Sequence, residues 1–170
     1  MKRIISFDWW RHSGLFFAGV ALSVTALGVW VAPALTTPGR DSIAKKIQAL
    51  QASQVRWIQV NLKTQRLVAW EGKNPVYAIV ISSGKDSTPT YPGIFKIQSK
   101  YATTRMKGAG YDIPNVPYAM YYEGNYGIHG AFWHRSFGTP VSHGCVNVAV
   151  NHARWLFDWA SVGTAVVITR

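Results

Sequence analysis

The sequence is poor in cysteine and in acidic side chains. Cys145 is the only cysteine among 170 residues, which excludes a disulfide within the chain, so the fold must be held by its hydrophobic core. A hydrophobic content of 48% over this length is enough for one globular domain, and the composition argues against a disordered or coiled-coil chain. Seven Asp and Glu against 18 Lys and Arg leave a net charge of +11, which favours polyanionic surroundings: nucleic acid, anionic lipid headgroups or an acidic cell wall.

A stretch that lacks charge altogether lies near the N-terminus. Residues 15–35 carry no charged side chain, and residues 1–14 carry three basic ones, a pattern typical of an export segment with a cytoplasmic basic region and an apolar core. Because about 20 helical residues span a bilayer, we expect residues 15–35 to remain as a transmembrane anchor or to be removed as a signal peptide by cleavage after Ala34. Either outcome places the remaining chain in the cell envelope outside the cytoplasm, which excludes nucleic acid and leaves an anionic membrane or wall surface.

Residues 36–54 are predicted to connect the export segment to the domain. A short polar linker opens this segment, and Ile43, Ile47 and Leu50 then recur at helical spacing. We therefore expect a brief helix that packs on the domain formed by residues 55–170.

The domain is predicted to be mainly β. From Arg56 onward apolar residues alternate with polar ones, and turn residues interrupt the chain at short intervals. Only residues 151–160 have the spacing of a substantial helix, so the expected fold class is a sandwich or barrel with one packed helix. Residues 101–117, rich in Gly, Thr and Pro, predict a long loop of the kind that often covers a site. The predicted strands are 56–62, 67–70, 76–81, 94–98, 118–122, 126–131 and 165–169.

The side chains that carry chemistry gather in residues 127–151. Three of the five histidines stand there together with Cys145. A cysteine nucleophile needs a base to form thiolate at neutral pH, a group that orients the base, and N–H donors where an oxyanion develops. Gly144 lets the backbone bend so that amide groups face a substrate carbonyl, and His129, at the end of a predicted strand, could reach the thiol from a neighbouring strand. These residues predict a cysteine-nucleophile site.

The same residues resemble the signature of the L,D-transpeptidase (YkuD-type) catalytic domain. That signature combines a His-Gly pair, a spacer of about a dozen residues, and a Ser/Thr-His-Gly-Cys run that an apolar residue and Arg or Asn follow. Here it reads His129-Gly130 and then residues 142–147. Upstream, Ser83-Gly84 and residues 88–95 are similar to the family's Ser/Thr-Gly and Thr-Pro-x-x-x-Gly-x-Phe stretches. The resemblance covers roughly residues 56–170.

This resemblance implies a YkuD-like β-sandwich and an acyltransferase that uses no cofactor and no metal. In this family the thiolate attacks the carbonyl of the diamino acid in a peptidoglycan tetrapeptide stem, expels the terminal D-Ala and passes the acyl group to an amine of a second stem. Carried over by residue, Cys145 is the nucleophile and His129 the general base and then acid. The amides of Gly144 and Cys145, with His143 alongside, would form the oxyanion site, and the carbonyl of Gly130 would orient His129.

Four further residues are candidates for substrate contact, each with a structural alternative. Ser142 is expected to support the site rather than to react. Asn147 stands where many family members have Arg, so the family's contacts at this position are not carried over. Trp133 and Tyr118 would line a groove for peptide stems or else belong to the core. His134 is expected to be a loop histidine in solvent or at the wall of the site.

Two other classes of protein compete with the enzyme interpretation. A zinc-dependent hydrolase would use the histidines and Cys145, but their spacing matches no common zinc pattern and the Glu base of such hydrolases is missing. A wall-binding module without activity would not need a thiol. Within the enzyme interpretation the acceptor stays open: a second stem gives a cross-link, water gives L,D-carboxypeptidase trimming, and a protein amine gives attachment to the wall. Stem peptides are the predicted partners, and the sequence predicts no protein partner.

Overall fold

The computed structural model describes residues 38–170, so the predicted export segment, residues 15–35, lies outside the described residues. In the described part, no helix combines the length and the apolar character that a membrane crossing requires. The elements, in chain order, are α1 (Pro38–Gln51), β1 (Arg56–Asn61), β2 (Arg66–Glu71), β3 (Asn74–Val80), β4 (Gly93–Lys96), β5 (Ser99–Gly108), β6 (Tyr111–Glu123), β7 (Tyr126–Gly130), β8 (Val146–Val148), α2 (Val150–Trp159) and β9 (Ala165–Thr169).

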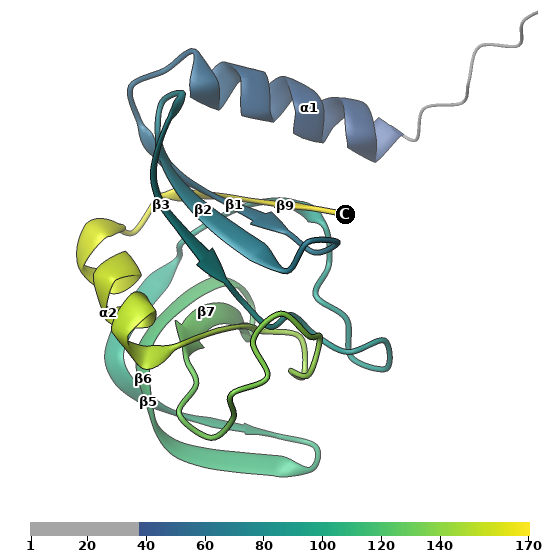
Figure 1. Ribbon diagram of the computed structural model, residues 1–170, viewed down its shortest axis with the longest axis vertical. Helices are drawn as coiled ribbons and strands as arrows, with labels where there is room; N and C mark the ends of the chain where they lie inside the picture. The colour runs from purple at the N-terminus through teal and green to yellow at the C-terminus, as the bar shows by residue number, and fades with distance from the viewer. Residues whose placement is uncertain (1–37) are drawn as a thin grey trace, which may run out of the picture. The chain divides into compact units, whose positions relative to one another are not determined.

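The strands form two sheets (Figure 1). The five-stranded sheet has the order β3-β2-β1-β9-β4, in which β1 and β9 run parallel and the other neighbours run antiparallel. The four-stranded sheet has the order β5-β6-β7-β8, in which only β7 and β8 run parallel. The chain therefore leaves the first sheet after β4 and returns to it with β9. The expected mainly β architecture is confirmed.

The five-stranded sheet is covered on both faces. Ile58 and Val60 of β1 are fully buried in the main core, as their alternation predicts. Trp57 points to the opposite face of the sheet and is fully buried as well, because Leu50 of α1 and Val167 of β9 pack against it. Helix α1 thus closes the outer face of this sheet (Figure 1), and it corresponds to the brief helix expected within residues 36–54.

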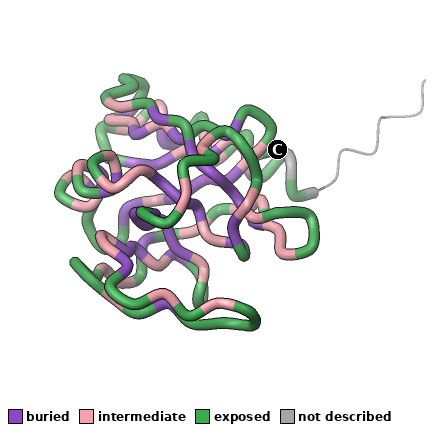
Figure 2. The backbone as a smooth tube through the Cα atoms, turned by 60° about the horizontal axis from the view of Figure 1, so that its bottom comes forward, coloured by how far each residue is buried: buried purple, intermediate pink, exposed green. Residues whose placement is uncertain are grey.

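The main core joins the two sheets and α2. Buried segments run through the middle of the molecule, with exposed chain around them (Figure 2). Val146 and Val148 of β8 are fully buried, and so are Ala153 and Leu156 on one face of α2. Helix α2 packs against β6 and β7. The helix predicted for residues 151–160 is therefore confirmed, with its apolar face in the core.

The long loop predicted for residues 101–117 is wrong. These residues form most of a hairpin of two long antiparallel strands, β5 and β6, whose pairing continues to Gly108 and Tyr111 on either side of a tight turn. The hairpin projects from the second sheet (Figure 1) and most of its side chains are at least partly exposed, so neither face has the apolar alternation that marks a strand. A bulge between Thr104 and Met106 disturbs the pattern further.

The short strand β8 is also absent from the predicted elements. It pairs in parallel with β7, and on its other side Asn147 forms a bridge with Ser82. Three residues, all buried, are too few to show a twofold period, so no pattern in the sequence marks this strand.

Candidate active site

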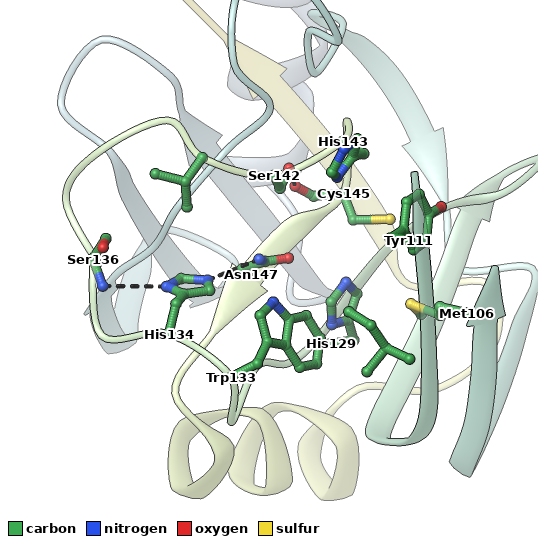
Figure 3. Close-up of a pocket in the computed structure, with 12 residues that line it drawn as sticks. Met106, Tyr111, His129, Trp133, His134, Ser136, Ser142, His143, Cys145 and Asn147 are labelled. Atoms are coloured by element: carbon green, nitrogen blue, oxygen red, sulfur yellow. Dashed lines mark hydrogen bonds between the residues drawn. The ribbon is translucent and has the colours of Figure 1, made fainter. Parts of the chain in front are cut away.

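The pairing of β7 with β8 brings Cys145 and His129 to the same face of the second sheet. In this ladder Ile128 lies opposite Val146, and His129 lies opposite Asn147. Side chains two residues apart share a face of a strand, so Cys145, directly before β8, faces the same side as Asn147 and therefore as His129. Figure 3 shows the Cys145 sulfur and the His129 ring directed into one space.

This space is a pocket of about 310 Å³. All of its lining residues come from the β5–β6 hairpin, β7, β8 and the long loop between β7 and β8. In the described chain none of them is Asp, Glu, Lys or Arg, so the pocket's titratable groups are three imidazoles, one phenol and one thiol. The lining residues are Met106, Tyr111, Ile113, His129, Trp133, His134, Ser136, Val141, Ser142, His143, Cys145 and Asn147.

Cys145 is half-buried at one wall of this pocket. Its Sγ lies 3.5 Å from the carbonyl oxygen of Asn125, to which the S–H group donates. Burial raises the pKa of the Cys145 thiol, and a hydrogen bond from the backbone of Gly127 opposes this by lowering it. The thiol is therefore protonated at neutral pH and needs a base in order to react.

His129 has the environment of a neutral base. The side chain is 2% exposed, and its Nδ1 lies 3.1 Å from the carbonyl oxygen of Gly130. A carbonyl only accepts, so Nδ1 carries the ring proton and Nε2 keeps its lone pair. Burial lowers the pKa of His129 to about 4, the hydrogen bond to Gly130 opposes this, and nearby His134 lowers it further. Trp133 stacks on the ring with 5.7 Å between centroids, which restricts its orientation.

The loop before Cys145 is shaped by Gly144. This residue has a φ of +117°, and a Cβ added to it would lie 2.5 Å from the ring of Tyr126, so only glycine fits. The Gly144 amide, expected at the oxyanion site, donates instead to Ser142 Oγ at 3.0 Å, and the Ser142 hydroxyl donates to the Cys145 carbonyl oxygen at 2.5 Å. Within residues 38–170 the N–H of Cys145 donates to no protein atom, which leaves it available to a ligand.

The upstream motif residues support this loop. The Thr90 hydroxyl donates to the Gly144 carbonyl oxygen at 2.7 Å and accepts the N–H of Gly84 at 2.8 Å. The Thr88 hydroxyl donates to the Ser142 carbonyl oxygen at 3.0 Å. Thr90 is 3% exposed, so its hydrogen bonds are shielded from water. These contacts give the physical reason why the Thr-Pro stretch and the cysteine motif occur in one sequence.

The remaining candidate residues do not all meet at the pocket. His143 is exposed in the pocket lining, with its ring 4.7 Å from that of Tyr111. Trp133 also lines the pocket. Tyr118 does not, because its ring packs against Phe157 of α2 with 5.7 Å between centroids. The structure thus places Tyr118 with the packed core and away from the expected groove.

The sequence reasoning missed the contribution of the hairpin to this pocket. Met106 comes from β5, and Tyr111 and Ile113 come from β6. Burial raises the pKa of the Tyr111 phenol, and the nearby Cys145 raises it further. The Gly-Ala-Gly run between Lys107 and Tyr111 is a turn signal that could have located this hairpin.

The family model of the YkuD L,D-transpeptidase catalytic domain matches residues 55–168. The chain belongs to this family. The match confirms the resemblance carried by the histidine and cysteine motifs, and it places the pocket within an L,D-transpeptidase catalytic domain.

Related sequences agree with this assignment. YciB of Bacillus subtilis is 28% identical over 132 residues, which cover 66% of this chain and 65% of YciB. L,D-transpeptidase 2 of Mycobacterium tuberculosis is 34% identical over 108 residues, which cover 55% of this chain and 26% of that protein. The chain therefore spans less than two thirds of the length of either relative.

A solved family member has the same fold. The L,D-transpeptidase of Enterococcus faecium, crystallised as a mutant in which a cysteine is replaced by serine, superposes with a TM-score of 0.65. It is 28% identical to this L,D-transpeptidase family member, and the alignment covers 69% of this chain and 50% of that one.

Proposed function

We propose that this protein is a peptidoglycan L,D-transpeptidase that forms an acyl-enzyme at Cys145 and transfers the acyl group to an amine. The observation that carries the proposal is the β7–β8 register, because it directs a protonated thiol and a neutral imidazole into one pocket. Membership of the family supports tetrapeptide stems as the donor. Among the described residues, the pocket lining also has no Asp, Glu, Lys or Arg that would repel a peptide carboxylate or an incoming amine.

The first step is the attack of Cys145 on the stem. The pKa of the thiol is raised and that of His129 is lowered, so both groups are neutral at rest. Nε2 of His129 removes the Sγ proton while the S–C bond forms at the carbonyl carbon of the diamino acid. Proton transfer and attack are thereby coupled, and no thiolate has to exist beforehand.

The negative charge on the substrate oxygen needs donors near Cys145. In this proposal the free N–H of Cys145 is the principal donor, and His143 in the pocket lining is the second. Gly144 supplies the conformation of the loop, since its own N–H is bound to Ser142.

The intermediate then collapses to the acyl-enzyme. The C–N bond to the terminal D-Ala breaks, and the proton held by His129 passes to the leaving amine. A pKa of about 4 makes the imidazolium a strong acid, which favours this transfer. His129 next accepts a proton from the acceptor amine as that amine forms a C–N bond at the thioester carbonyl. The C–S bond then breaks, and His129 returns this proton to Sγ of Cys145.

The complex of a related protein with imipenem supports the use of imipenem as a covalent probe of this site. The L,D-transpeptidase LdtMt1, 26% identical to this chain with a TM-score of 0.63, was solved in complex with imipenem. We propose that imipenem acylates Cys145: an S–C bond forms at the lactam carbonyl, the lactam C–N bond opens, and the ring nitrogen takes the proton. The adduct is expected as a mass increase that Cys145→Ala lacks.

We also propose that residues 55–170 act outside the cytoplasmic membrane, delivered by residues 15–35. The substrate of the family is a wall polymer, and the net charge of +11 favours an anionic membrane or wall surface. If residues 15–35 are a retained anchor, the isolated protein begins at Met1 and sediments with membranes. A mature N-terminus at Leu35 would show instead that they are a cleaved signal peptide.

The deciding experiment uses purified protein and disaccharide-tetrapeptide fragments of peptidoglycan, with products identified by mass spectrometry. The proposal predicts cross-linked dimers that have lost one D-Ala. Tripeptide products alone would assign the protein as a carboxypeptidase, and a wall protein in the product would identify attachment. Cys145→Ala should form none of these. Activity that chelation removes and zinc restores would overturn the cysteine mechanism in favour of a zinc hydrolase.

A further inference from the structure

His134 and Asn147 form a pair in the pocket wall that the mechanism above does not use. Asn147 lies opposite His129 in the β7–β8 ladder and is 3% exposed. Its backbone is fixed on the far side of β8, where its N–H and carbonyl bond with Ser82 at 2.8 and 2.9 Å. Its carboxamide nitrogen lies 2.9 Å from His134 Nε2, and both side chains line the pocket (Figure 3).

A backbone contact sets the tautomer of His134. The N–H of Ser136 donates to His134 Nδ1 at 3.2 Å. A backbone N–H has no second role, so Nδ1 is the unprotonated nitrogen and the neutral ring carries its proton on Nε2. Burial lowers the pKa of His134, which keeps the ring neutral near pH 7. Towards Asn147, His134 is therefore a donor.

This tautomer decides which end of the Asn147 carboxamide faces the reacting groups. Two N–H groups cannot donate to one another, and the two ends of a carboxamide have almost the same shape. The orientation that satisfies His134 places the carboxamide oxygen against Nε2 and turns the NH2 group into the pocket. The pocket wall then presents two N–H donors on the face that carries Cys145 and His129.

The donors lie where they can reach the acyl donor. Residues two apart on a strand are separated by roughly 6–7 Å, so Asn147 lies about two residues' length of extended peptide from Cys145. Carbonyl and carboxylate oxygens accept hydrogen bonds, and within residues 38–170 the pocket lining holds no Lys or Arg that would bind them by charge. A donor at this place therefore recognises an oxygen close to the reacting bond.

We infer that His134 is a positioning residue: through the Ser136–His134–Asn147 contacts it turns the Asn147 NH2 group into the pocket, where that group binds a carbonyl or carboxylate oxygen of the acyl donor. This inference rests on the proposed function for the identity of the donor. The orientation of the pair itself does not depend on activity.

The kinetic test compares two substitutions of His134 with a matched control. His134→Leu removes the donor to Asn147 and should raise KM about 10-fold with kcat changed less than about 3-fold, because one substrate hydrogen bond is lost. His134→Gln replaces Nε2–H with an amide N–H and should restore most of the affinity. His152→Leu is the control, since His152 contacts Tyr77 outside the pocket. Equal loss of kcat in His134→Leu and His134→Gln, with KM unchanged, would overturn the positioning role.

A comparison of two substrates distinguishes a terminal carboxylate from a backbone carbonyl as the oxygen that Asn147 binds. Asn147→Asp keeps the acceptor for His134 but replaces the donor with a negative charge. If the bound oxygen is the terminal carboxylate, this variant should lose more affinity for a free tetrapeptide than for the C-terminal amide. If it is a backbone carbonyl, both substrates should weaken equally. Unchanged affinity for both substrates would refute donation by Asn147.

A measurement without substrate tests the orientation separately from the proposed function. Nitrogen-15 NMR of the histidine rings should show His134 in the form protonated on Nε2 near pH 7, and the Asn147 NH2 signals should shift in His134→Leu. A ring protonated on Nδ1 would overturn the inference even if the protein is an active transpeptidase. Conversely, the expected tautomer in a protein that does not turn over stem peptides would leave the orientation standing and reject the proposed function.

Discussion

The two sheets are built from similar strands but differ in burial and in their contribution to the active site. Strands β1 and β9 lie inside the five-stranded sheet, and of their residues only Arg56 is exposed, because α1 covers one face and the main core the other. None of the residues that line the active-site pocket comes from this sheet. The four-stranded sheet is less covered: its β7 holds His129, and its β8 begins directly after Cys145.

Besides packing against the second sheet in the main core, the first sheet supports the site by hydrogen bonds from its loops. Directly after β3, Ser82 exchanges two backbone hydrogen bonds with Asn147, and Ser83 accepts the N–H groups of Val141 and Ser142. The Gln65 side chain in turn holds Ser83 through hydrogen bonds of 2.7 and 2.8 Å. We therefore expect substitutions in the first sheet to change stability and substitutions in the second to change rate.

The largest difference in the rate of acylation is expected between substitutions of His129, in β7, and His143, in the loop before β8. His129→Ala should slow acylation of Cys145 on the order of 100 to 10,000-fold and recover partly only at a pH above the pKa of about 8.5 of a free thiol, because burial raises the pKa of Cys145. His143→Ala should slow acylation by on the order of 10 to 1,000-fold and keep the shape of the pH profile, because it removes only a hydrogen-bond donor to the oxyanion. Acylation rates of both variants across pH provide the test. Alkaline recovery in His143→Ala alone would exchange the two roles.

Substitution of Trp57 should separate stability from activity. This side chain is fully buried between α1 and β9, so Trp57→Ala should lower the free energy of unfolding by about 3–5 kcal/mol while kcat/KM per folded molecule stays within about 3-fold. Tyr111→Ala, in the pocket lining, should do the reverse, with stability changed by less than about 1 kcal/mol and KM raised roughly 10-fold. Urea unfolding and steady-state kinetics on both variants measure this. If both variants lost stability and kcat/KM to the same extent, the proposed distinction between the two sheets would be wrong.

Acid should destabilise the second sheet through His129. Its pKa is about 4 in the folded protein against about 6.5 in the unfolded chain, so the unfolded state binds the proton more tightly. The stability due to the neutral ring is fully present above pH 6.5 and falls as pH drops to 4, by on the order of 3 kcal/mol. Urea unfolding at pH 7 and pH 4 should show a correspondingly smaller loss in His129→Gln. The same loss in both proteins would place the acid sensitivity elsewhere.

The features that could be predicted from the sequence are those with a buried strand face or a chemical motif. The alternation around Ile58 and Val60 predicted β1 because that strand has a buried face, and the histidine and cysteine motifs predicted the family because they carry chemistry. The β5–β6 hairpin could not be recognised by alternation, since its burial follows no twofold period. The pairing of His134 with Asn147 was likewise out of reach, because it depends on a loop conformation and on the register of β8.

The central claim is that Cys145 forms the acyl-enzyme with a tetrapeptide stem, and intact-mass spectrometry tests it most directly. Wild-type protein and Cys145→Ala are mixed with a stem whose side-chain amine is acetylated, so that it cannot act as acceptor, then quenched in acid at short times, weighed intact and digested. The account predicts that the wild type gains the mass of the stem less its terminal D-Ala, located on the peptide that contains Cys145, and that Cys145→Ala gains nothing while its thermal unfolding is unchanged. The same adduct on Cys145→Ala, or product formation by that variant at the wild-type rate, would contradict it.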